Sequence, residues 1–233
     1  MSAISSKGFP DETRRDRDPR VVRSREATLD AARSLFLDQG YAGTTMDEIA
    51  AAAGLTKRTL YNNYPDKETI FKHAVHDIMK FAGNFARGLE DRFSVVTSCD
   101  LLERTFYDLA DELALSIIRI EVVAIRRLLI GEIRTFPAMA SEYFDAAPGQ
   151  VIAALSKGFE RLARIELLRI SQPKRAAAQF AYLIAGEHLD RAILTGTVPP
   201  KKEIVACARD GVETFLARYA VWPADRSISK RTS

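Results

Sequence analysis

Apolar residues recur at spacings of three and four along most of the chain, and no segment shows the period-two alternation of a strand. The first helix is expected to begin at Asp18-Pro19, because Asp is a good N-cap and Pro is tolerated at the first helical position. Gly40 is expected to end it, since glycine takes positive φ without a Cβ clash. The apolar face of this helix comprises Val22, Leu29, Ala32, Leu35 and Phe36.

Two short helices are predicted after it. Thr45 and Glu48 fit a capping box, in which each side chain bonds an unpaired backbone N–H of the first turn. Gly54 ends that helix, and Thr56 can cap the next one, at 57–63. Two short helices joined by a glycine-containing turn of about three or four residues are typical of a helix-turn-helix.

The remainder is predicted to be helical as well. Asp66 can cap a long fourth helix from Lys67 to about Phe85, and prolines and glycines such as Pro148-Gly149 separate the later helices. The fold class is therefore all-α, with a three-helix N-terminal domain joined by the fourth helix to a helical C-terminal domain. The later helices are expected at 99–116, 119–135, 138–146, 149–168, 174–194 and 201–221. The domain plan is a basic flexible arm at 1–18, the helix-turn-helix domain at 19–66, the C-terminal domain at 67–222 and a flexible tail at 223–233.

The helix predicted at 57–63 has two chemically different sides. At about 100° per residue, Lys57, Arg58, Tyr61 and Asn62 occupy one arc, and Leu60 lies outside it. Arg and Lys can donate to guanine, Asn can pair with adenine, and Tyr can donate to phosphate. Cations in a first turn oppose the helix dipole, which is expected where function overrides stability. The arc predicts a surface for double-stranded DNA; a solvated basic face is the structural alternative.

Residues 29–71 resemble the N-terminal domain of the TetR family of bacterial repressors. The resemblance rests on AARSLFLDQGYAGTT, on DEIAAAAGLTKRTLYNNYPDKETIF and on the spacing between them. It implies that Thr45 and Lys67 contact DNA phosphates. Tyr64 fills a position where the family usually has an aromatic residue, and we predict that it also contacts the DNA backbone. Met46 stands where some members have a basic DNA contact. The third helix would contact bases and backbone through Lys57, Arg58, Thr59, Tyr61 and Asn63, beside Asn62 of the arc.

The second half resembles C-terminal domains of efflux-pump repressors, of the AcrR and AefR type. The similar stretches are RRLLIGEIRTFPAMASEYF and KRAAAQFAYLIAGEHLDRAIL. Such domains bind ligands and dimerise, so the last two long helices are expected to pair with their copies, unless their stripes serve only the internal core. The predicted dimer-interface residues are Phe180, Ile184, His188, Ala208, Val212, Phe215 and Tyr219.

The inducer is expected to be a small molecule held in the C-terminal domain, but its identity is not legible in the sequence. Aromatic side chains on helices serve equally well as plain core, and an arginine can equally be ion-paired on the surface. The residues singled out for the ligand pocket are Phe81, Phe85, Phe106, Tyr107 and Arg126, with Phe136 and Arg127 as further candidates.

Composition narrows the class of protein. The chain has 47% hydrophobic and 28% charged residues and a net charge of +3, which matches the excess of seven basic over four acidic residues at 1–25. That arm could follow phosphates, or could be a solvated tail. No apolar run is long enough to cross a bilayer and no signal peptide is visible, so a cytoplasmic location is expected.

No metal site or cofactor is predicted. His73 and His76 have no third ligand nearby in the sequence, and the adjacent Glu187 and His188 are not expected to face one another. Cys99 and Cys207 are expected to be reduced thiols, with redox sensing as the alternative.

Together these features predict a homodimeric, ligand-responsive and sequence-specific transcriptional repressor that reads a palindromic operator and is not an enzyme. A dimer would read two half-sites roughly 34–36 Å apart. The rival interpretations are a non-specific architectural DNA-binding protein and, with less support, a helical-bundle enzyme.

Overall fold

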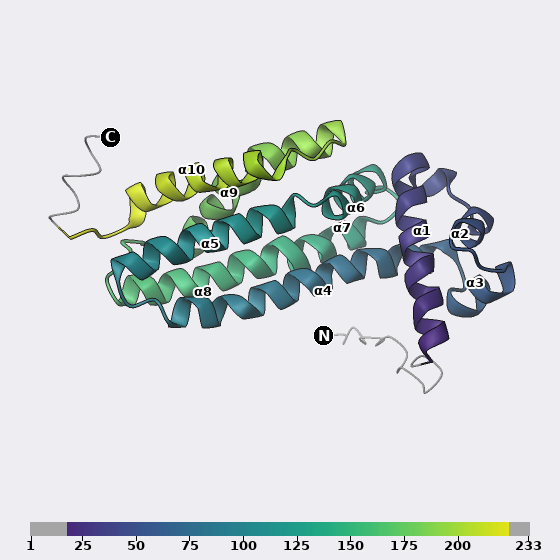
Figure 1. Ribbon diagram of the computed structural model, residues 1–233, viewed down its shortest axis with the longest axis horizontal. Coiled ribbons are helices and arrows are strands. Elements are labelled where there is room, and N and C mark those ends of the chain that lie inside the picture. The colour runs from purple at the N-terminus through teal and green to yellow at the C-terminus, as the bar shows by residue number, and fades with distance from the viewer. Residues whose placement is uncertain (1–17, 224–233) are drawn as a thin grey trace, which may run out of the picture. The chain divides into compact units, whose positions relative to one another are not determined.

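The computed structural model describes residues 18–223, shown in Figure 1. Apart from an isolated antiparallel bridge between Leu168 and Ala220, the regular structure of this part of the chain is helical, which confirms the all-α prediction. The chain forms two compact units with their boundary between Ala74 and Val75. The predicted arm and tail lie outside the described residues, apart from Asp18 and Pro223 at their inner ends. No helix within 18–223 is long and apolar enough to cross a membrane.

The first unit contains α1 (Pro19–Gly43), α2 (Met46–Ala52), α3 (Lys57–Asn63) and the start of α4 (Lys67–Ser94). Helix α1 begins as predicted, with the Asp18 carboxylate accepting the backbone N–H of Arg20 at 2.8 Å. Gly40 does take positive φ, at 76°, but helical structure resumes and continues to Gly43. The regular helix that starts at Pro19 therefore ends at Gly40 as predicted, and a short further helical segment follows the kink.

The second unit holds the rest of α4 and the later helices. Helices α8 and α10 both pack against α9, and α10 also packs along α5. Helix α4 is longer than predicted, ending at Ser94 rather than near Phe85. The elements after α4 are α5 (Cys99–Ile117), α6 (Ile120–Gly131), α7 (Pro137–Phe144), the π-helical turn η2 (Asp145–Gly149), α8 (Gln150–Arg164), α9 (Pro173–Thr195) and α10 (Lys201–Tyr219).

Pro148 does not separate two helices, contrary to the sequence prediction. It lies inside η2, which carries the chain directly from α7 into α8. A π-helical turn widens the helix locally and can absorb the steric demands of a proline ring. The break expected at Pro148-Gly149 is thus replaced by continuous helical structure that lines one wall of a cavity described below.

Five phenylalanines form the centre of the second unit. They come from α4, α5, α8, α9 and α10, and each is at most 1% exposed. Successive rings contact one another edge-on or stacked, with centroids 5.1–6.1 Å apart, and such pairs contribute about 0.5–1.5 kcal/mol each beyond burial. This cluster consists of Phe93, Phe106, Phe159, Phe180 and Phe215.

Gly158 of α8 provides the first test of this packing. A Cβ at this position would lie 2.1 Å from the Phe93 ring, which is itself 1% exposed and has no room to move. We expect Gly158→Ala to lower the free energy of unfolding by about 1–3 kcal/mol through overpacking. Denaturant unfolding of the full chain measures this.

The matched control is Gly88→Ala in α4, where a new Cβ meets no atom within 4 Å. Removing a glycine from an exposed helix interior is expected to stabilise the protein by roughly 0.5–1 kcal/mol. If both variants gain stability, the close contact between Gly158 and Phe93 is not as described.

Candidate functional site

Both helices of the helix-turn-helix, α2 and α3, have a threonine side chain that caps the N-terminus. Thr45 accepts the N–H of Glu48, and the Glu48 carboxylate accepts both the N–H and the hydroxyl of Thr45 at 2.8 Å, so the predicted capping box is present. Gly54 turns the chain with φ of 67°. Thr56 then caps α3 by accepting the N–H of Thr59 at 3.1 Å. Both helices are thus fixed at their N-termini by their own side chains.

The two sides of α3 separate as the sequence predicted. Leu60 is fully buried, together with Ile49 and Ala50 of α2. Tyr61 is 50% exposed although it is a large aromatic residue. An exposed surface of basic, amide and phenolic groups can donate to phosphates and base edges. We call this exposed set, Lys57, Arg58, Tyr61 and Asn62, the α3 face.

Within residues 18–223, Lys57 is the one member of the α3 face that forms an ion pair. Its ammonium lies 2.6 Å from the Asp47 carboxylate, which also raises the pKa of the lysine. Both side chains are more than half exposed, and exposed ion pairs of this kind contribute little to stability. The pairing is therefore weak enough to be exchanged for a phosphate.

Tyr64 and Asn63 do not lie on the α3 face. The Tyr64 side chain is 3% exposed and its ring packs edge-on against His73, with centroids 5.3 Å apart. The Asn63 amide donates to the Ser24 hydroxyl of α1 at 2.8 Å. The buried Tyr64 cannot reach DNA, so its assignment as a DNA contact is corrected to a scaffolding role. The half-buried Asn63 stays a predicted contact, although its amide is already used by α1.

Lys67 is also used inside the unit. Its ammonium donates to the backbone carbonyls of Tyr41 and Thr44, at 2.6 and 2.7 Å, and lies 4.3 Å from the centre of the Tyr41 ring. The last carbonyls of a helix lack partners within the helix, so Lys67 caps the end of α1. A phosphate at this residue would have to compete with both hydrogen bonds.

Thr45 and Thr59 remain near the α3 face but differ in exposure. Thr45 is exposed while it caps α2. Thr59 is half-buried, and its hydroxyl shares a hydrogen bond of 2.9 Å with the hydroxyl of Thr56. Thr45 can therefore present its hydroxyl to a backbone phosphate more readily than Thr59 can.

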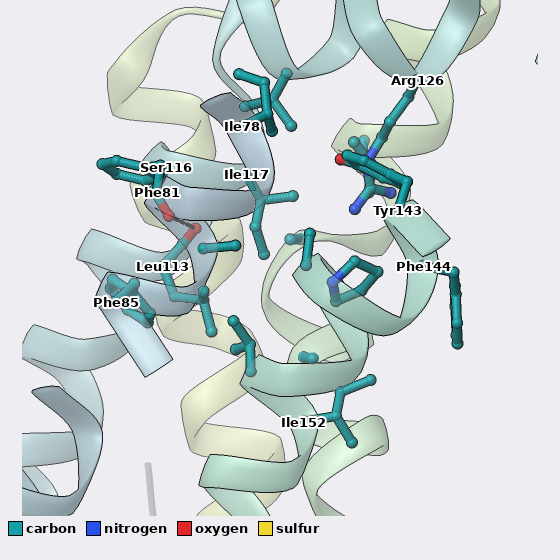
Figure 2. Close-up of a pocket in the computed structure, with 18 of the residues that line it drawn as sticks. Ile78, Phe81, Phe85, Leu113, Ser116, Ile117, Arg126, Tyr143, Phe144 and Ile152 are labelled. Carbon is teal, nitrogen blue, oxygen red and sulfur yellow. Dashed lines mark hydrogen bonds between the residues drawn. The ribbon is translucent and has the colours of Figure 1, made fainter. Parts of the chain in front are cut away.

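A cavity of about 150 Å³ lies wholly within the second unit, between α4, α5, α6, α7, η2, α8 and α9 (Figure 2). Its walls are mainly apolar. Two hydrogen bonds are made by polar groups of the lining. The Arg126 guanidinium donates to the Tyr143 hydroxyl at 3.1 Å, and the Ser116 hydroxyl donates to the Leu113 carbonyl at 2.8 Å. Arg126 is the single charged side chain in the described lining.

Three of the five side chains predicted for the pocket line it. Phe81 and Phe85 contribute from α4, and Arg126 from α6. Phe106 does not reach it, because the ring is fully buried in the phenylalanine cluster. Tyr107 points away and donates to Glu213 of α10 at 3.4 Å, so both of these assignments are wrong.

Sequence reasoning missed three lining residues with hydroxyl groups, Ser116, Tyr143 and Tyr182. Tyr143 is 17 positions from Arg126, and neither periodicity nor a known motif links the two. Phe136 and Arg127, the further candidates, are outside the lining set.

The predicted dimer-interface residues lie in the core of the single chain. Phe180, Ile184, Ala208, Val212 and Phe215 are all fully buried there, and His188 is 8% exposed. The Tyr219 hydroxyl donates to Gln179 within the chain at 2.6 Å. Side chains without exposed surface cannot contact a second copy, so the interface assignment is wrong for the five fully buried residues, which form the internal core, and stays a prediction for His188 and Tyr219.

Comparison with known proteins shows two family matches. Residues 29–74 match the bacterial regulatory proteins of the TetR family, and residues 105–221, half of the chain, match the C-terminal domain of AefR-like transcriptional repressors. Among curated proteins, the IcaR negative regulator of the biofilm operon icaADBC from Staphylococcus epidermidis is 29% identical over 85 residues, 36% of this chain. The match spans 46% of that relative's length.

Solved structures resemble a larger part of the chain. A TetR-family transcriptional regulator from Mesorhizobium loti is 26% identical, with a TM-score of 0.74 over 88% of this chain and 100% of that one. The flavonoid-responsive regulator FrrA is 28% identical, with a TM-score of 0.59 over 87% of this chain and 100% of that one. SmeT, the efflux-pump repressor of Stenotrophomonas maltophilia, shares the fold at 23% identity, with a TM-score of 0.57 over 84% of this chain and 90% of that one.

The capping box predicts a dependence of stability on pH. Hydrogen bonds from the Thr45 hydroxyl and backbone hold the pKa of Glu48 below its ordinary value of 4.5. A carboxyl with a lowered folded-state pKa contributes stability at neutral pH, and this contribution is lost as the pH falls through that pKa. We therefore expect Glu48→Gln to be less stable than the wild type near neutral pH, and the difference to shrink below pH 4.5.

Denaturant unfolding at a series of pH values measures this difference. Asp30→Asn is a suitable control, because Asp30 is an exposed carboxylate of α1 whose ion pair is with Arg33, outside the capping box. A Glu48→Gln deficit that stays constant from neutral to acidic pH would contradict the capping role of the carboxylate.

Proposed function

This chain belongs to the TetR family of bacterial regulatory proteins, with an AefR-like C-terminal domain, and we propose that it is a homodimeric repressor that a small molecule releases from a specific DNA operator. The observation that carries the proposal is the α3 face: basic, amide and aromatic side chains exposed on a doubly capped helix. The family is one of regulators rather than enzymes, which favours this function over a helical-bundle enzyme.

DNA recognition is assigned to α3 itself. Arg58 and Asn62 are exposed and can reach base edges, while Tyr61 and Lys57 can bind phosphates. Thr45 adds a phosphate contact at the start of α2. A single helix of this length buries little surface, so operator affinity requires two copies that read half-sites about one helical turn apart, roughly 34–36 Å.

The dimer interface is placed on the outer surface of α9 and α10. Because the inward stripe of these helices is buried in the core, only outward side chains are left for a partner. Leu183 and Leu194 on α9 are 39% and 74% exposed, an unusual exposure for leucine in a folded domain. An interface on these leucines would cover apolar surface that a single chain leaves in water.

The inducer is assigned to the cavity of the second unit. A volume of about 150 Å³ is near that of a cavity that holds one benzene ring. The Arg126 guanidinium next to the Tyr143 hydroxyl can bind an acidic or hydroxyl group on such a ring. We therefore propose a small aromatic ligand with one anionic or phenolic group. The resemblance to the flavonoid-responsive regulator FrrA supports an aromatic class.

Helix α4 can carry the signal, because it begins in the first unit and lines the cavity further along. Lys67 ties its first turn to the end of α1, and Phe81 and Phe85 face the ligand cavity. A ligand that displaces α4 would change the separation of the two α3 helices. To shift a 1:99 equilibrium to 99:1, it must prefer the released state by about 5.5 kcal/mol.

Substitution of Arg58 tests DNA recognition. We expect Arg58→Ala to weaken operator binding by about 10- to 100-fold, because an arginine contact to a base contributes about 1–3 kcal/mol. Tyr61→Ala should also weaken it. Fluorescence anisotropy with DNA from upstream of the gene measures the affinity.

Arg104→Ala in the second unit is the matched control, since it removes the same charge from an exposed side chain of α5. Equal losses in Arg58→Ala and Arg104→Ala would mean that only total charge matters, and would favour a non-specific architectural protein.

Substitution of Arg126 tests the ligand class. Benzoate and toluene are similar in size but differ in charge, so we expect benzoate to bind the full chain and Arg126→Ala to weaken it by about tenfold or more, with little effect on toluene. Ligand-observed NMR measures both affinities. Arg127→Ala, the exposed neighbour on α6 outside the lining, should bind both like the wild type.

An Arg127→Ala variant that loses benzoate as strongly as Arg126→Ala would contradict the assignment of the cavity. Toluene binding without benzoate binding would reject the anionic class and leave a purely apolar ligand.

A further inference from the structure

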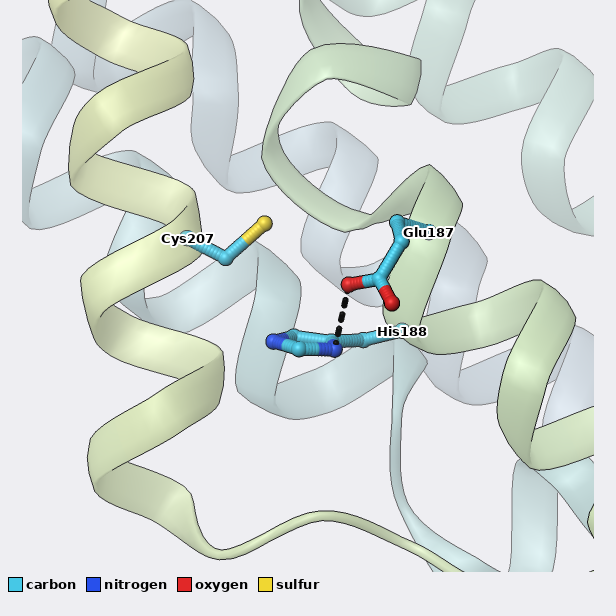
Figure 3. Close-up of side chains that lie close together, drawn as sticks. All are labelled: Glu187, His188 and Cys207. Carbon is cyan, nitrogen blue, oxygen red and sulfur yellow. Dashed lines mark ion pairs between the residues drawn. The ribbon is translucent and has the colours of Figure 1, made fainter.

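Three side chains with metal-binding atoms converge where α9 packs against α10. They are Glu187 and His188 of α9 and Cys207 of α10, and their donor atoms all lie within 4.8 Å of one another (Figure 3). The expectation that Glu187 and His188 do not face one another is wrong, because Glu187 Oε2 lies 2.8 Å from His188 Nδ1. The group belongs neither to the α3 face nor to the ligand cavity, and it does not depend on the proposed function.

The hydrogen bond on the far side of His188 fixes its tautomer. Nε2 lies 3.2 Å from the backbone carbonyl oxygen of Glu203. A carbonyl only accepts, so Nε2 carries the hydrogen, and in the neutral ring Nδ1 is left with an unprotonated lone pair. Metal-binding histidines commonly donate their second ring nitrogen to a carbonyl in this way.

Nδ1 of His188 has no hydrogen-bond partner among the described residues, although His188 is only 8% exposed. The Glu187 oxygen lies 2.8 Å away as an ion-pair contact and makes no hydrogen bond with Nδ1. An unprotonated nitrogen and a carboxylate oxygen this close repel one another, and either a proton or, with a small side-chain movement, a metal ion relieves that repulsion. A buried polar atom without a hydrogen bond is rare, and a bound ion is one of its recognised explanations.

We propose that Glu187, His188 and Cys207 bind a divalent ion of the Zn²⁺ type. A carboxylate oxygen, an imidazole nitrogen and a thiolate sulfur are the three ligand classes that zinc takes, with a water or an external ligand in the fourth position. Arg191, which lies 2.9 Å from Glu187 Oε1, supports the carboxylate from outside as the Glu203 carbonyl supports the imidazole.

Small side-chain movements suffice to close the site. Zinc–ligand bonds of about 2.0–2.3 Å in a tetrahedron place donor atoms roughly 3.3–3.8 Å apart. The Glu187 carboxylate, on an exposed side chain, must move slightly away from His188, and the half-buried Cys207 must move inward. The thiol of Cys207 gives its proton to solvent as the sulfur binds the ion. The bound ion then links α9 to α10.

Two alternatives involve Cys207 or His188 without a metal. The first is a redox-sensing thiol; Cys207 is half-buried, which limits the access of oxidants to its sulfur. The second is a plain ion pair between Glu187 and a protonated His188, which leaves Cys207 uninvolved. The role of the Cys207 sulfur therefore separates these alternatives from a metal site.

Titration of the metal-free full-length protein with Co²⁺ and Zn²⁺ tests the proposal. We expect one ion per chain, a thiolate-to-Co²⁺ charge-transfer absorption, and loss of that absorption when Zn²⁺ displaces Co²⁺. Cys207→Ser should abolish the absorption and weaken Zn²⁺ binding by at least about tenfold, and Glu187→Gln should weaken binding while keeping the absorption.

Cys99→Ser is the matched control, because Cys99 is the other half-buried thiol of the chain and its sulfur contacts the Val221 carbonyl at 3.5 Å instead. It should bind both ions like the wild type. Absence of the thiolate absorption in the wild type, or the same loss in Cys99→Ser as in Cys207→Ser, would overturn the site and leave the ion pair as its explanation.

Discussion

Helix α4 runs without interruption from Lys67 to Ser94, a length of about 42 Å. Its first residues belong to the first unit and the rest to the second. Its first turn is held by the Lys67 ammonium, which binds the carbonyl of Tyr41 in α1 and that of Thr44 just after it. Its last residue lies beside Phe93 of the phenylalanine cluster. Arg161 of α8 donates to three carbonyls at this end, those of Phe93, Ser94 and Val96. Because a continuous helix bends little, a change at the cavity-lining residues in its middle must be accommodated at one end or the other.

The two ends differ in how firmly they are held. At the far end, Phe93 packs against Phe106 and Phe159 of the phenylalanine cluster, and a guanidinium binds the last carbonyls. The near end is held by one ammonium, one capping aspartate and the core of the first unit. Movement of α4 is therefore expected to be expressed mainly at its N-terminal end, where α3 is attached through Tyr64. This asymmetry is a physical reason for a ligand in the second unit to affect DNA binding by the first.

Local signals in the sequence were sufficient for the order of the helices, for the capping box of Thr45 and Glu48, and for the exposed side of α3, but not for the end of α4 or for the break expected at Pro148. These signals were insufficient where the role of a residue depends on which distant part of the chain its side chain contacts. Apolar residues four positions apart, such as Phe180 and Ile184, give the same sequence pattern whether they face the core of their own chain or a second copy. In the same way, the sequence does not distinguish a core phenylalanine such as Phe106 from one that lines a pocket. Lys67 looked like a free cation because the carbonyls that it caps lie more than 20 positions earlier.

Regulation of a specific operator requires that the α3 face read a DNA sequence rather than merely bind phosphates. Selection from a pool of random DNA duplexes with the full chain tests this most directly. The predicted result is enrichment of a palindromic site with half-sites about one helical turn apart, and its loss in the Arg58→Ala variant. Binding without enrichment of any sequence, at an affinity set by salt alone, would contradict the account and identify a non-specific DNA-binding protein.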